Sequence, residues 1–381
     1  MAKVSIKDVA VRAEVSVGTV SNVLNRPDTV RPATRARVQA AIAELRFVPN
    51  ASARQLAAGH SRTIAYLVLD ATNPFFTDVG RGIEEVAKAE RLALFICNSD
   101  QDAEREDQYL EQLTELRVRG VLITAIDYTN PRLTQLREQG VPVVLVDRAP
   151  DGLDAWCTVG VDDVAGGELA VNHLLDGGHE RLAFVGGPMD ILQVSDRHTG
   201  AVKTVDAAGL AGPTMTTIST TALTIAEGRS AGERLLGLPR RARPTAAFCA
   251  NDLLAIGLLQ HLTQLGVRVP DDLAIVGYDD IEYAAAAAVP LTSVAQPRFL
   301  LGRTAAELLT HEADHPTTHE HQHVTFPPEL VARASTASSP SRGARLLTPP
   351  GARAATRRSP HPPPPRRGGS PAPGAPTTPV R

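Results

Sequence analysis

The sequence predicts a small all-helical module at the N-terminus, a large α/β body after it, and a C-terminal tail without regular structure. Residues 1–48 contain three short segments with apolar residues at helical spacing. From Thr63 onward, apolar β-rich runs alternate with amphipathic helices, which is the pattern of parallel sheets covered by helices on both faces. From about Ser338 the composition shifts to Pro, Arg, Gly, Ser and Ala, as in disordered tails, so we assign residues 338–381 to such a tail.

The overall composition fits a soluble protein of two unequal domains. The chain has 381 residues, of which 43% are apolar and 4% aromatic, so it can bury a sizeable aliphatic core. It has no apolar run of about 18 residues, and the N-terminus lacks the apolar region of a signal peptide. Cys97, Cys157 and Cys249 match no disulfide or metal spacing. We therefore expect a cytoplasmic protein without membrane association, cofactor or metal.

Charge is distributed unevenly along the chain. Residues 1–60 contain nine Lys/Arg and four Asp/Glu, a net of +5, and the tail contains eight Arg and no acid, a net of +8. Because the whole chain carries −3, residues 61–337 carry −16. A basic head on an acidic body suggests that the head contacts a polyanion, although basic segments of this size are also common on solvated surfaces. The basic tail could add non-specific DNA affinity, but a solvated tail without a role is the simpler interpretation.

Capping signals predict where the first helices begin. Ser5 is an expected N-cap, with Asp8 in the capping-box position. The helix breaks near Glu14, and Ser16 is a second expected N-cap. A third helix is predicted from about Pro32 to Leu45. Three short helices with a tight turn between the first two indicate a helix-turn-helix, although a small bundle that binds protein is the alternative.

The second of these helices is the one that a helix-turn-helix places in the major groove. Its exposed side chains are short; an asparagine suits adenine, and an apolar methyl group suits the thymine methyl. Phosphate contacts would set register rather than sequence. The DNA contacts predicted within this module are Ser5, Ser16, Val17, Gly18, Thr19, Ser21, Asn22 and Asn25.

The run SIKDVAVRAEVSVGTVSNVLN, followed by TRARVQAAIAELRFVPNASARQLAAGHSRTIAYLV, resembles the lactose-repressor/galactose-repressor family of bacterial regulators. The resemblance extends with few gaps to about Ser335. It implies a periplasmic-binding-protein-like body of two subdomains, a homodimer on a palindromic double-stranded operator, and control by a small-molecule effector. A repressor is expected, because repression is the commoner behaviour in this family.

The same resemblance implies a hinge helix in residues 49–61, which folds when two subunits lie side by side on the operator. Leu56 matches the leucine that inserts into the minor groove, and such apolar wedges kink DNA. Asn50, Ala53 and Arg54 match neighbouring contacts. From the residues alone, an ordinary linker containing a leucine is an equally good interpretation.

One turn residue departs from the family pattern. Glu14 occupies the position between the first two helices where the family usually has glycine. If the turn needs a positive φ, a glutamate costs on the order of 1 kcal/mol there. We expect a less ideal turn that still allows DNA binding.

Eight strand–helix units are too many for one comfortable open sheet, so two doubly wound subdomains facing a cleft are expected. We predict an N-subdomain of residues 62–160 and 291–320 and a C-subdomain of residues 161–290 and 321–337, which together form an effector-binding and dimerisation domain. The clearest expected helices are Phe76–Glu90, Ala103–Leu116, Val164–Leu175 and Asp252–Leu265.

Ligands of such sheets bind beyond the carboxyl ends of the strands, and here those ends carry many polar and aromatic residues. This mixture suits a polyhydroxylated ligand such as a sugar or nucleoside, although each residue alone is more simply a cap or a solvated loop residue. Leu223 falls where the family often has a stacking aromatic, which suggests a different or smaller ligand. The effector contacts that the resemblance implies are Phe75, Phe76, Asp147, Arg148, Asp162, Arg197, Leu223, Asn251 and Asp279.

Other functions fit the sequence less well. An enzyme on a doubly wound fold is disfavoured because the chain has no G-x-G-x-x-G, Walker-type or G-x-S-x-G motif. A solute-binding protein of a transporter would need export, and no signal segment is present. The stretch 311–323 contains five histidines, but their spacing matches no zinc pattern, so a surface loop is the preferred interpretation.

Overall fold

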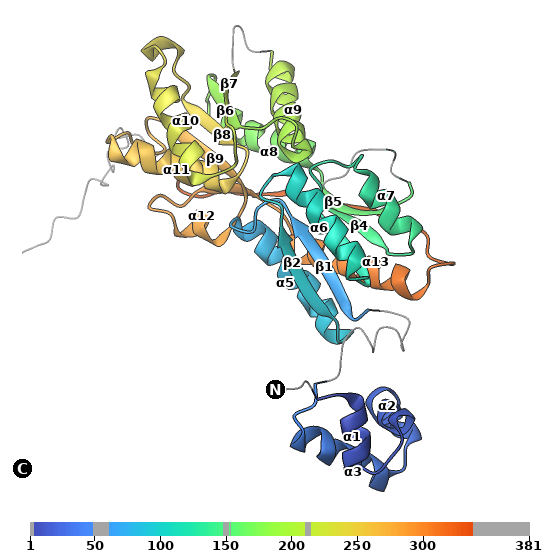
Figure 1. Cartoon of the computed structure of the whole chain (residues 1–381). Coiled ribbons are helices and arrows are strands. Elements are labelled where there is room, and N and C mark those ends of the chain that lie inside the picture. Colours follow the sequence, from blue (N-terminus) through green and yellow to red (C-terminus); the bar gives the residue numbers. More distant parts are fainter. Residues whose placement is uncertain (1–3, 49–60, 148–151, 153, 210–214, 338–381) are drawn as a thin grey trace, which may run out of the picture. The chain divides into compact units, whose positions relative to one another are not determined.

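The computed structural model describes residues 4–48, 61–147, 152, 154–209 and 215–337 (Figure 1). Nearly all of the predicted hinge, residues 49–61, and all of the predicted tail, residues 338–381, lie outside the described residues.

The N-terminal module consists of the helices α1 (Ile6–Arg12), α2 (Val17–Asn25) and α3 (Pro32–Glu44). One fully buried valine from each, Val9, Val20 and Val38, meets in a small core of its own. The capping signals act as predicted. The Ser5 backbone N–H donates to the Asp8 carboxylate at 2.8 Å, and Ser16 Oγ accepts from the Thr19 N–H at 3.1 Å. The predicted helix-turn-helix is confirmed.

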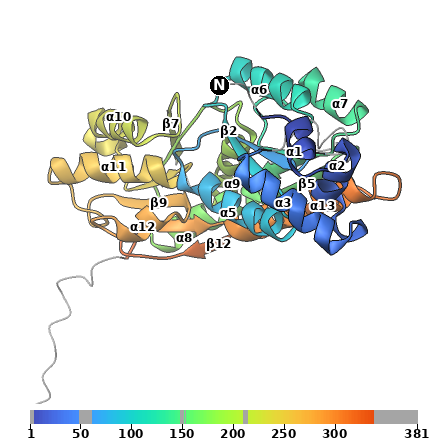
Figure 2. The same ribbon diagram turned by 60° about the horizontal axis from the view of Figure 1, so that its bottom comes forward.

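The first sheet of the body has the strand order β11-β5-β4-β3-β1-β2, and all its described pairs are parallel. Side chains alternate between two helical layers. The helices α5 (Pro74–Ala89) and α13 (Arg298–Asp314) cover one face, and α6 (Ala103–Glu115) and α7 (Pro131–Glu138) cover the other (Figure 2). Tyr66 belongs to the core under α5 and α13, and Leu67 belongs to the core under α6 and α7. The strands are β1 (Thr63–Val68), β2 (Ala93–Asn98), β3 (Gly120–Ile123), β4 (Val143–Asp147), β5 (Cys157–Val161) and β11 (His323–Phe326).

The second sheet has the order β12-β10-β9-β8-β6-β7 and is parallel except for β12, which pairs antiparallel with β10. The helices α8 (Asp163–Asp176) and α9 (Leu192–Ala207) pack together, as do α10 (Ile225–Gly237) and α11 (Asp252–Gln264) (Figure 1). A short helix, α12 (Glu282–Ala286), follows β9 in the sequence. The strands are β6 (Leu182–Gly186), β7 (Met215–Ser219), β8 (Ala246–Cys249), β9 (Ala274–Asp279), β10 (Thr292–Ala295) and β12 (Glu329–Val331).

The chain passes between the two subdomains at different points from those predicted. We expected the return to the N-subdomain at residue 291, but β10 pairs with β9 in the second sheet, so the return comes only before α13. We expected the final passage at residue 321, but β11 pairs with β5 in the first sheet. It therefore comes between β11 and β12.

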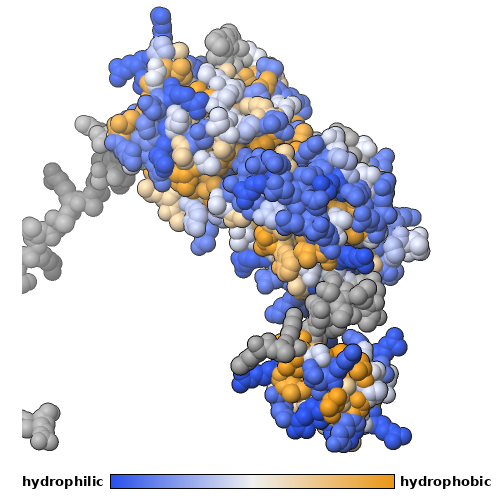
Figure 3. Space-filling view, in the orientation of Figure 1, coloured by the Kyte–Doolittle hydropathy of each residue, from blue (hydrophilic) through white to orange (hydrophobic). Residues whose placement is uncertain are grey.

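Hydrophobic side chains gather on the surface over β2 and α5 (Figure 3). Phe95 and Ile96 of the edge strand β2 are 47% and 54% exposed. Ile96 lies beside Leu92, Leu94 and Gly80 along a groove between this strand and α5. Among the described residues, every helix is too short or too polar to span a membrane.

Candidate functional site

The outer surface of α2 carries the short side chains that the sequence predicts at the DNA. Val17 is 41% exposed, and Gly18 and Asn22 are exposed beside it, while Val20 and Val23 turn into the core. Ser21 accepts a hydrogen bond from Asn25 Nδ2 at 3.2 Å. The N-terminal end of α2 therefore presents methyl, hydroxyl and amide groups without long side chains around them.

The remaining predicted DNA contacts divide into two groups. Ser5 and Ser16 are the N-caps of α1 and α2, so their side chains already have structural partners within the domain. Thr19 is half-buried and bonds to Ser16 Oγ at 2.9 Å. The contacts predicted in the hinge, at Asn50, Ala53, Arg54 and Leu56, lie outside the described residues.

The turn between α1 and α2 has a positive φ at Glu14. Glu14 has a φ of 52°, in the left-handed region that only glycine adopts without cost. Its N–H and the next N–H still donate to carbonyls of α1, those of Val11 and Ala10. The turn therefore keeps the hydrogen bonds of a helix-turn-helix and carries backbone strain at one residue.

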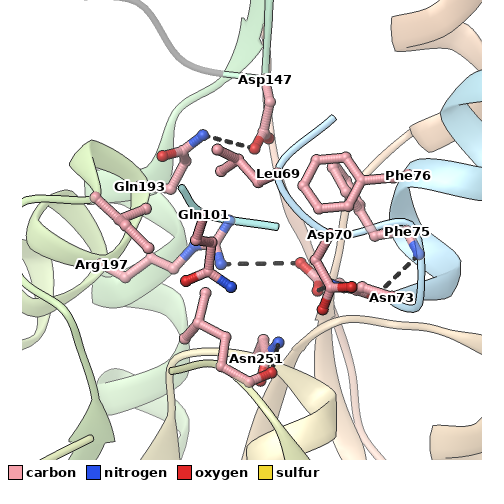
Figure 4. Close-up of a pocket in the computed structure, with 13 residues that line it drawn as sticks. Leu69, Asp70, Asn73, Phe75, Phe76, Gln101, Asp147, Gln193, Arg197 and Asn251 are labelled. Carbon is pink, nitrogen blue, oxygen red and sulfur yellow. Dashed lines mark hydrogen bonds and ion pairs between the residues drawn. The ribbon is translucent and has the colours of Figure 1, made fainter. Parts of the chain in front are cut away.

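A cavity of about 30 Å³ lies beyond the carboxyl ends of the strands and takes its walls from both subdomains (Figure 4). A cavity of this size holds on the order of two water molecules, so a larger ligand requires the subdomains to separate. The lining residues are Leu69, Asp70, Asn73, Phe75, Phe76, Gln101 and Asp147 from the N-subdomain, and Ile191, Gln193, Arg197, Leu223, Asn251 and Asp279 from the C-subdomain.

Two hydrogen bonds cross this cavity from one subdomain to the other. Gln193 Nε2, at the start of α9, donates to Asp147 Oδ2 at 2.7 Å, and this bond is drawn in Figure 4. Asn73 Nδ2, at the start of α5, donates to Asp279 Oδ2 at 3.3 Å. Amide-to-carboxylate bonds of this kind are ones that the hydroxyl groups of a ligand can replace.

Arg197 forms the polar floor of the cavity and is itself 5% exposed. Its Nε donates to Asp163 Oδ1 at 2.7 Å, and its Nη1 donates to the Ala250 carbonyl at 2.8 Å. The guanidinium also lies 3.7 Å from the centre of the Tyr278 ring. Although burial opposes the charge, the Asp163 carboxylate holds the pKa of Arg197 above its ordinary value. The arginine is therefore a buried cation with partners on several sides.

Close helix packing positions this arginine. A Cβ on Gly167 of α8 would lie 2.1 Å from the carbonyl oxygen of Arg197, so only glycine lets α8 and α9 approach this closely. The short separation brings Asp163, in the first turn of α8, within reach of the guanidinium.

Asp147 has a carboxylate oxygen that can still accept a hydrogen bond from a ligand. Its Oδ1 has no hydrogen-bond partner among the described residues, and its backbone has a φ of 77°. Burial raises the pKa of Asp147 to about 7; the nearby Asp163 also raises it, and Arg197 opposes this effect. Asp279 shares the left-handed backbone, with a φ of 96°. Strain of this kind gathers at functional sites.

The structure brings together seven of the nine predicted effector contacts. Arg148 lies outside the described residues. Asp162 does not line the cavity: its carboxylate caps α8 by accepting from the Ala165 N–H at 2.9 Å. The neighbouring Asp163 is the buried residue of the two. The seven are Phe75, Phe76, Asp147, Arg197, Leu223, Asn251 and Asp279.

Several of these residues also have structural roles. Asn251 caps α11 by accepting from the Leu254 N–H at 2.9 Å, and its amide donates to the Leu223 carbonyl at 3.1 Å. Sequence reasoning missed Leu69, Gln101, Ile191 and Gln193 as lining residues. Gln193 was detectable, because it lies four residues before Arg197 and therefore on the same face of α9.

Comparison with known proteins agrees with this geometry. Residues 5–50 match the family model described as bacterial regulatory proteins, lacI family, and residues 171–336 match the model of the periplasmic binding protein-like domain. The solved structure of the lac repressor dimer bound to operator and the anti-inducer ONPF aligns with a TM-score of 0.74 at 27% identity, covering 88% of this chain and 99% of the other.

Two curated relatives align over nearly their full lengths. The HTH-type transcriptional repressor PurR of Aliivibrio fischeri (strain ATCC 700601 / ES114) is 36% identical over 333 residues, which are 87% of this chain and 98% of the relative. The ribose operon repressor of Escherichia coli (strain K12) is 37% identical over 332 residues, 87% of this chain and 99% of the relative. Both are named as repressors and neither as an enzyme. This chain therefore belongs to the lacI family of bacterial transcription regulators.

Proposed function

We propose that the chain is an operator-binding repressor whose DNA affinity is set by a polyhydroxylated effector of about monosaccharide size. The observation that carries this proposal is the cavity walled by both subdomains and crossed by the Gln193–Asp147 and Asn73–Asp279 bonds. A ligand that replaces these bonds changes how the subdomains close. Because such a ligand has different contacts in the two states, it shifts the equilibrium between them.

The lining of the cavity supports a sugar over a flat purine base. Asp147 offers a hydroxyl donor a carboxylate oxygen that has no hydrogen-bond partner among the described residues. On one wall the rings of Phe75 and Phe76 meet edge to face, with their centres 5.1 Å apart. On the other wall Leu223 replaces the aromatic side chain that would sandwich a base. A ring with several hydroxyl groups and one apolar face fits this arrangement. One of the relatives named above is the repressor of a ribose operon.

The repressor acts as a homodimer on a palindromic site in this proposal. The lac repressor in the aligned structure is a dimer on its operator. The exposed Phe95 and Ile96 of β2 supply an apolar surface that a second copy can cover. Since bacterial operators lie on the chromosome, we place the protein in the cytoplasm, where its three cysteines stay free, as they are in the structure.

The proposal is tested by selecting binding sites for the full chain from a random DNA library and measuring affinity by fluorescence anisotropy. We expect a palindrome, bound with a salt dependence shallower than that of scrambled DNA. One class in a panel of pentoses, hexoses, nucleosides and purine bases should then change operator affinity by about 5- to 150-fold. Equal affinity for palindrome and scrambled DNA would refute the regulator assignment. A response to bases alone would refute the sugar.

Leu56→Ala separates the hinge from the effector cavity. If Leu56 inserts at the operator centre, the variant loses specific affinity by at least about tenfold while effector binding, followed by calorimetry, stays unchanged. Unchanged DNA binding would show that the hinge assignment is wrong.

A further inference from the structure

Four side chains with metal-binding atoms converge at the end of the first sheet that is opposite the effector cavity. They are Cys157, the first residue of β5; Glu312, in the last turn of α13; and His319 and His321, in the loop between α13 and β11. Cys157 Sγ lies 3.1 Å from His319 Nε2 and 3.8 Å from His321 Nδ1. Glu312 Oε2 lies 3.9 Å and 4.0 Å from the same two nitrogens.

We propose that Cys157, Glu312, His319 and His321 bind a divalent transition-metal ion of the zinc type. Zinc in proteins takes four ligands from sulfur, imidazole nitrogen and carboxylate oxygen at about 2.0–2.3 Å, so ligand atoms around a tetrahedral zinc lie about 3.4–3.6 Å apart. The four atoms here all lie within 4.8 Å of one another. Shifts of a few tenths of an ångström in most of these spacings bring them to the expected geometry.

The charges of the four ligands also match. A cysteine thiolate and a glutamate carboxylate together neutralise a divalent cation, and the two imidazoles bind in the neutral form. Glu312 Oε2 is buried without a hydrogen-bond partner among the described residues, which is costly for a carboxylate. A bound cation would supply the partner that this oxygen lacks.

Neighbouring groups orient the ligands. His319 is 2% exposed, and its Nδ1 lies 2.8 Å from Nδ1 of His311. A proton shared by these two atoms leaves His319 Nε2 free to bind the metal. The Gln322 N–H donates to Cys157 Sγ at 3.4 Å, as N–H groups do to metal-bound sulfur. Partners of this kind fix the ring orientation of metal-binding histidines.

The nearby cation does not occupy the site. Arg137 lies near enough to His321 and Glu312 to act on both electrostatically. Its guanidinium, however, lies 4.9 Å from the centre of the Trp156 ring, and its Nη1 donates to the Ala155 carbonyl at 3.4 Å.

The five histidines of residues 311–323 therefore have different roles. His319 and His321 are ligands, and His311 supports His319. His315 stacks on His311 with ring centres 4.6 Å apart, and His323 bonds to Thr158 Oγ1 at 3.0 Å; neither reaches the cluster. They are the matched controls, because they are histidines of the same short stretch, residues 311–323.

The experiment is a cobalt titration of the full chain after reduction and chelator treatment, with Zn²⁺ as competitor. One equivalent of Co²⁺ should bind with a near-ultraviolet thiolate-to-cobalt band and the visible bands of four-coordinate cobalt, and Zn²⁺ should displace it. Cys157→Ser should abolish the thiolate band, whereas Cys97→Ser should keep it. His321→Ala should weaken binding at least tenfold, and His311→Ala should weaken it by about 10- to 100-fold.

Thermal melts of the chelated variants establish that each is folded. A wild-type chain without the thiolate band would overturn the proposal, as would a band that persists in Cys157→Ser. The proposal would also be overturned if His315→Ala or His323→Ala weakened cobalt binding as much as His321→Ala does, because the outer histidines would then bind the metal.

Discussion

Arg197 shows how a binding residue and a structural residue can be the same side chain. By resemblance alone it is an effector contact, and its replacement by alanine is expected to remove the effector response and keep DNA binding. In the structure it is a buried cation held by Asp163, with Asp279 3.8 Å away. Removing it leaves the buried Asp163 without its cation and takes one of two cationic neighbours from Asp279. The alanine variant therefore cannot report on the effector alone.

We predict that Arg197→Ala lowers the free energy of unfolding by about 3–5 kcal/mol, the usual cost of breaking a buried ion pair. Urea denaturation followed by circular dichroism measures this. Lys203→Ala, which removes an exposed cation paired with Glu168, is the control and should cost less than about 1 kcal/mol. Equal effects of the two variants would contradict the buried-pair interpretation.

Glu14 allows the backbone strain of the turn to be measured. Glu14→Gly should stabilise the N-terminal domain by about 1 kcal/mol, because glycine adopts a φ of 52° without the steric cost of a Cβ. Hydrogen exchange of the amides in α1–α3 measures the local free energy of unfolding. Glu14→Ala keeps the Cβ and should give no gain; an equal gain from alanine would assign the effect to charge instead.

Asp147 should make stability depend on pH. Because its pKa is about 7 in the folded protein and near 4 when unfolded, its contribution is fully present below about pH 4 and is lost as the pH rises through 7. Asp147→Asn should remove this loss, on the order of 1–3 kcal/mol between pH 5 and pH 8. Urea denaturation across that range measures the difference.

Asp272 is the control, because its pKa is lowered in the folded protein whereas that of Asp147 is raised. Arg268 lowers the pKa of Asp272 to about 2, so its contribution is present above about pH 4 and is lost only as the pH falls through 2. Asp272→Asn should therefore leave the slope between pH 5 and pH 8 unchanged. Parallel curves for wild type and Asp147→Asn would show that Asp147 ionises normally.

Individual residues were predictable from sequence where the signal is local. The N-caps Ser5 and Ser16 follow from residue type and spacing. The cluster at Cys157 was not predictable, because its ligands come from three elements and Cys157 lies 155 residues before Glu312 in the sequence. Asp162, which the resemblance implies as an effector contact, caps α8, whereas the neighbouring Asp163 is buried against Arg197. Which of two adjacent aspartates faces inward depends on where α8 begins.

The edge strand β2 is the expected dimer interface. Ile96→Asp should raise the dissociation constant of the homodimer by about 100-fold, because it would bury an unpaired carboxylate in an apolar interface. Sedimentation velocity over a concentration series measures this. Leu265→Asp is the control: it places the same charge at a different exposed apolar residue, which is 60% exposed. This variant should leave the dimer intact. If Ile96→Asp remains dimeric, β2 lies outside the interface.

Helices were predicted more accurately than the last strands. Periodicity and caps place α6 and α11 to within one residue of their observed ends. The apolar residues of VTFPPELVARAST alone suggest one final strand, but Pro327 and Pro328 interrupt it, because proline cannot donate a ladder hydrogen bond. Its two halves became β11 in one sheet and β12 in the other.

The hydrogen bonds that cross the cavity between the two subdomains make closure testable. Gln193→Ala removes the amide that donates to Asp147 across the cavity. An effector that replaces this bond would then lack that amide as a partner for its hydroxyl groups, and a buried polar group without its partner costs about 1–3 kcal/mol. We expect effector affinity, measured by calorimetry, to fall by about 10- to 100-fold. Thr199→Ala, at an exposed position of the same helix, should not change it; equal losses would mean that α9 is generally weakened.

The two-subdomain architecture followed from the count of strand–helix units, but the passages between subdomains did not. The sequence of a buried parallel strand does not show to which subdomain it belongs, because both hydrophobic cores are built from the same apolar residue types. Only the pairing of β10 with β9, and of β11 with β5, decides to which sheet each belongs.

These late passages have a consequence for the order in which the protein matures on the ribosome. The DNA-binding domain is complete once residue 48 has emerged, whereas the first sheet waits for α13 and β11, which end at residue 326. During most of its synthesis the nascent chain therefore carries a finished DNA-binding head on an unfinished sensor. A message cut short before α13 would yield a product able to fold its helix-turn-helix but unable to complete the first sheet.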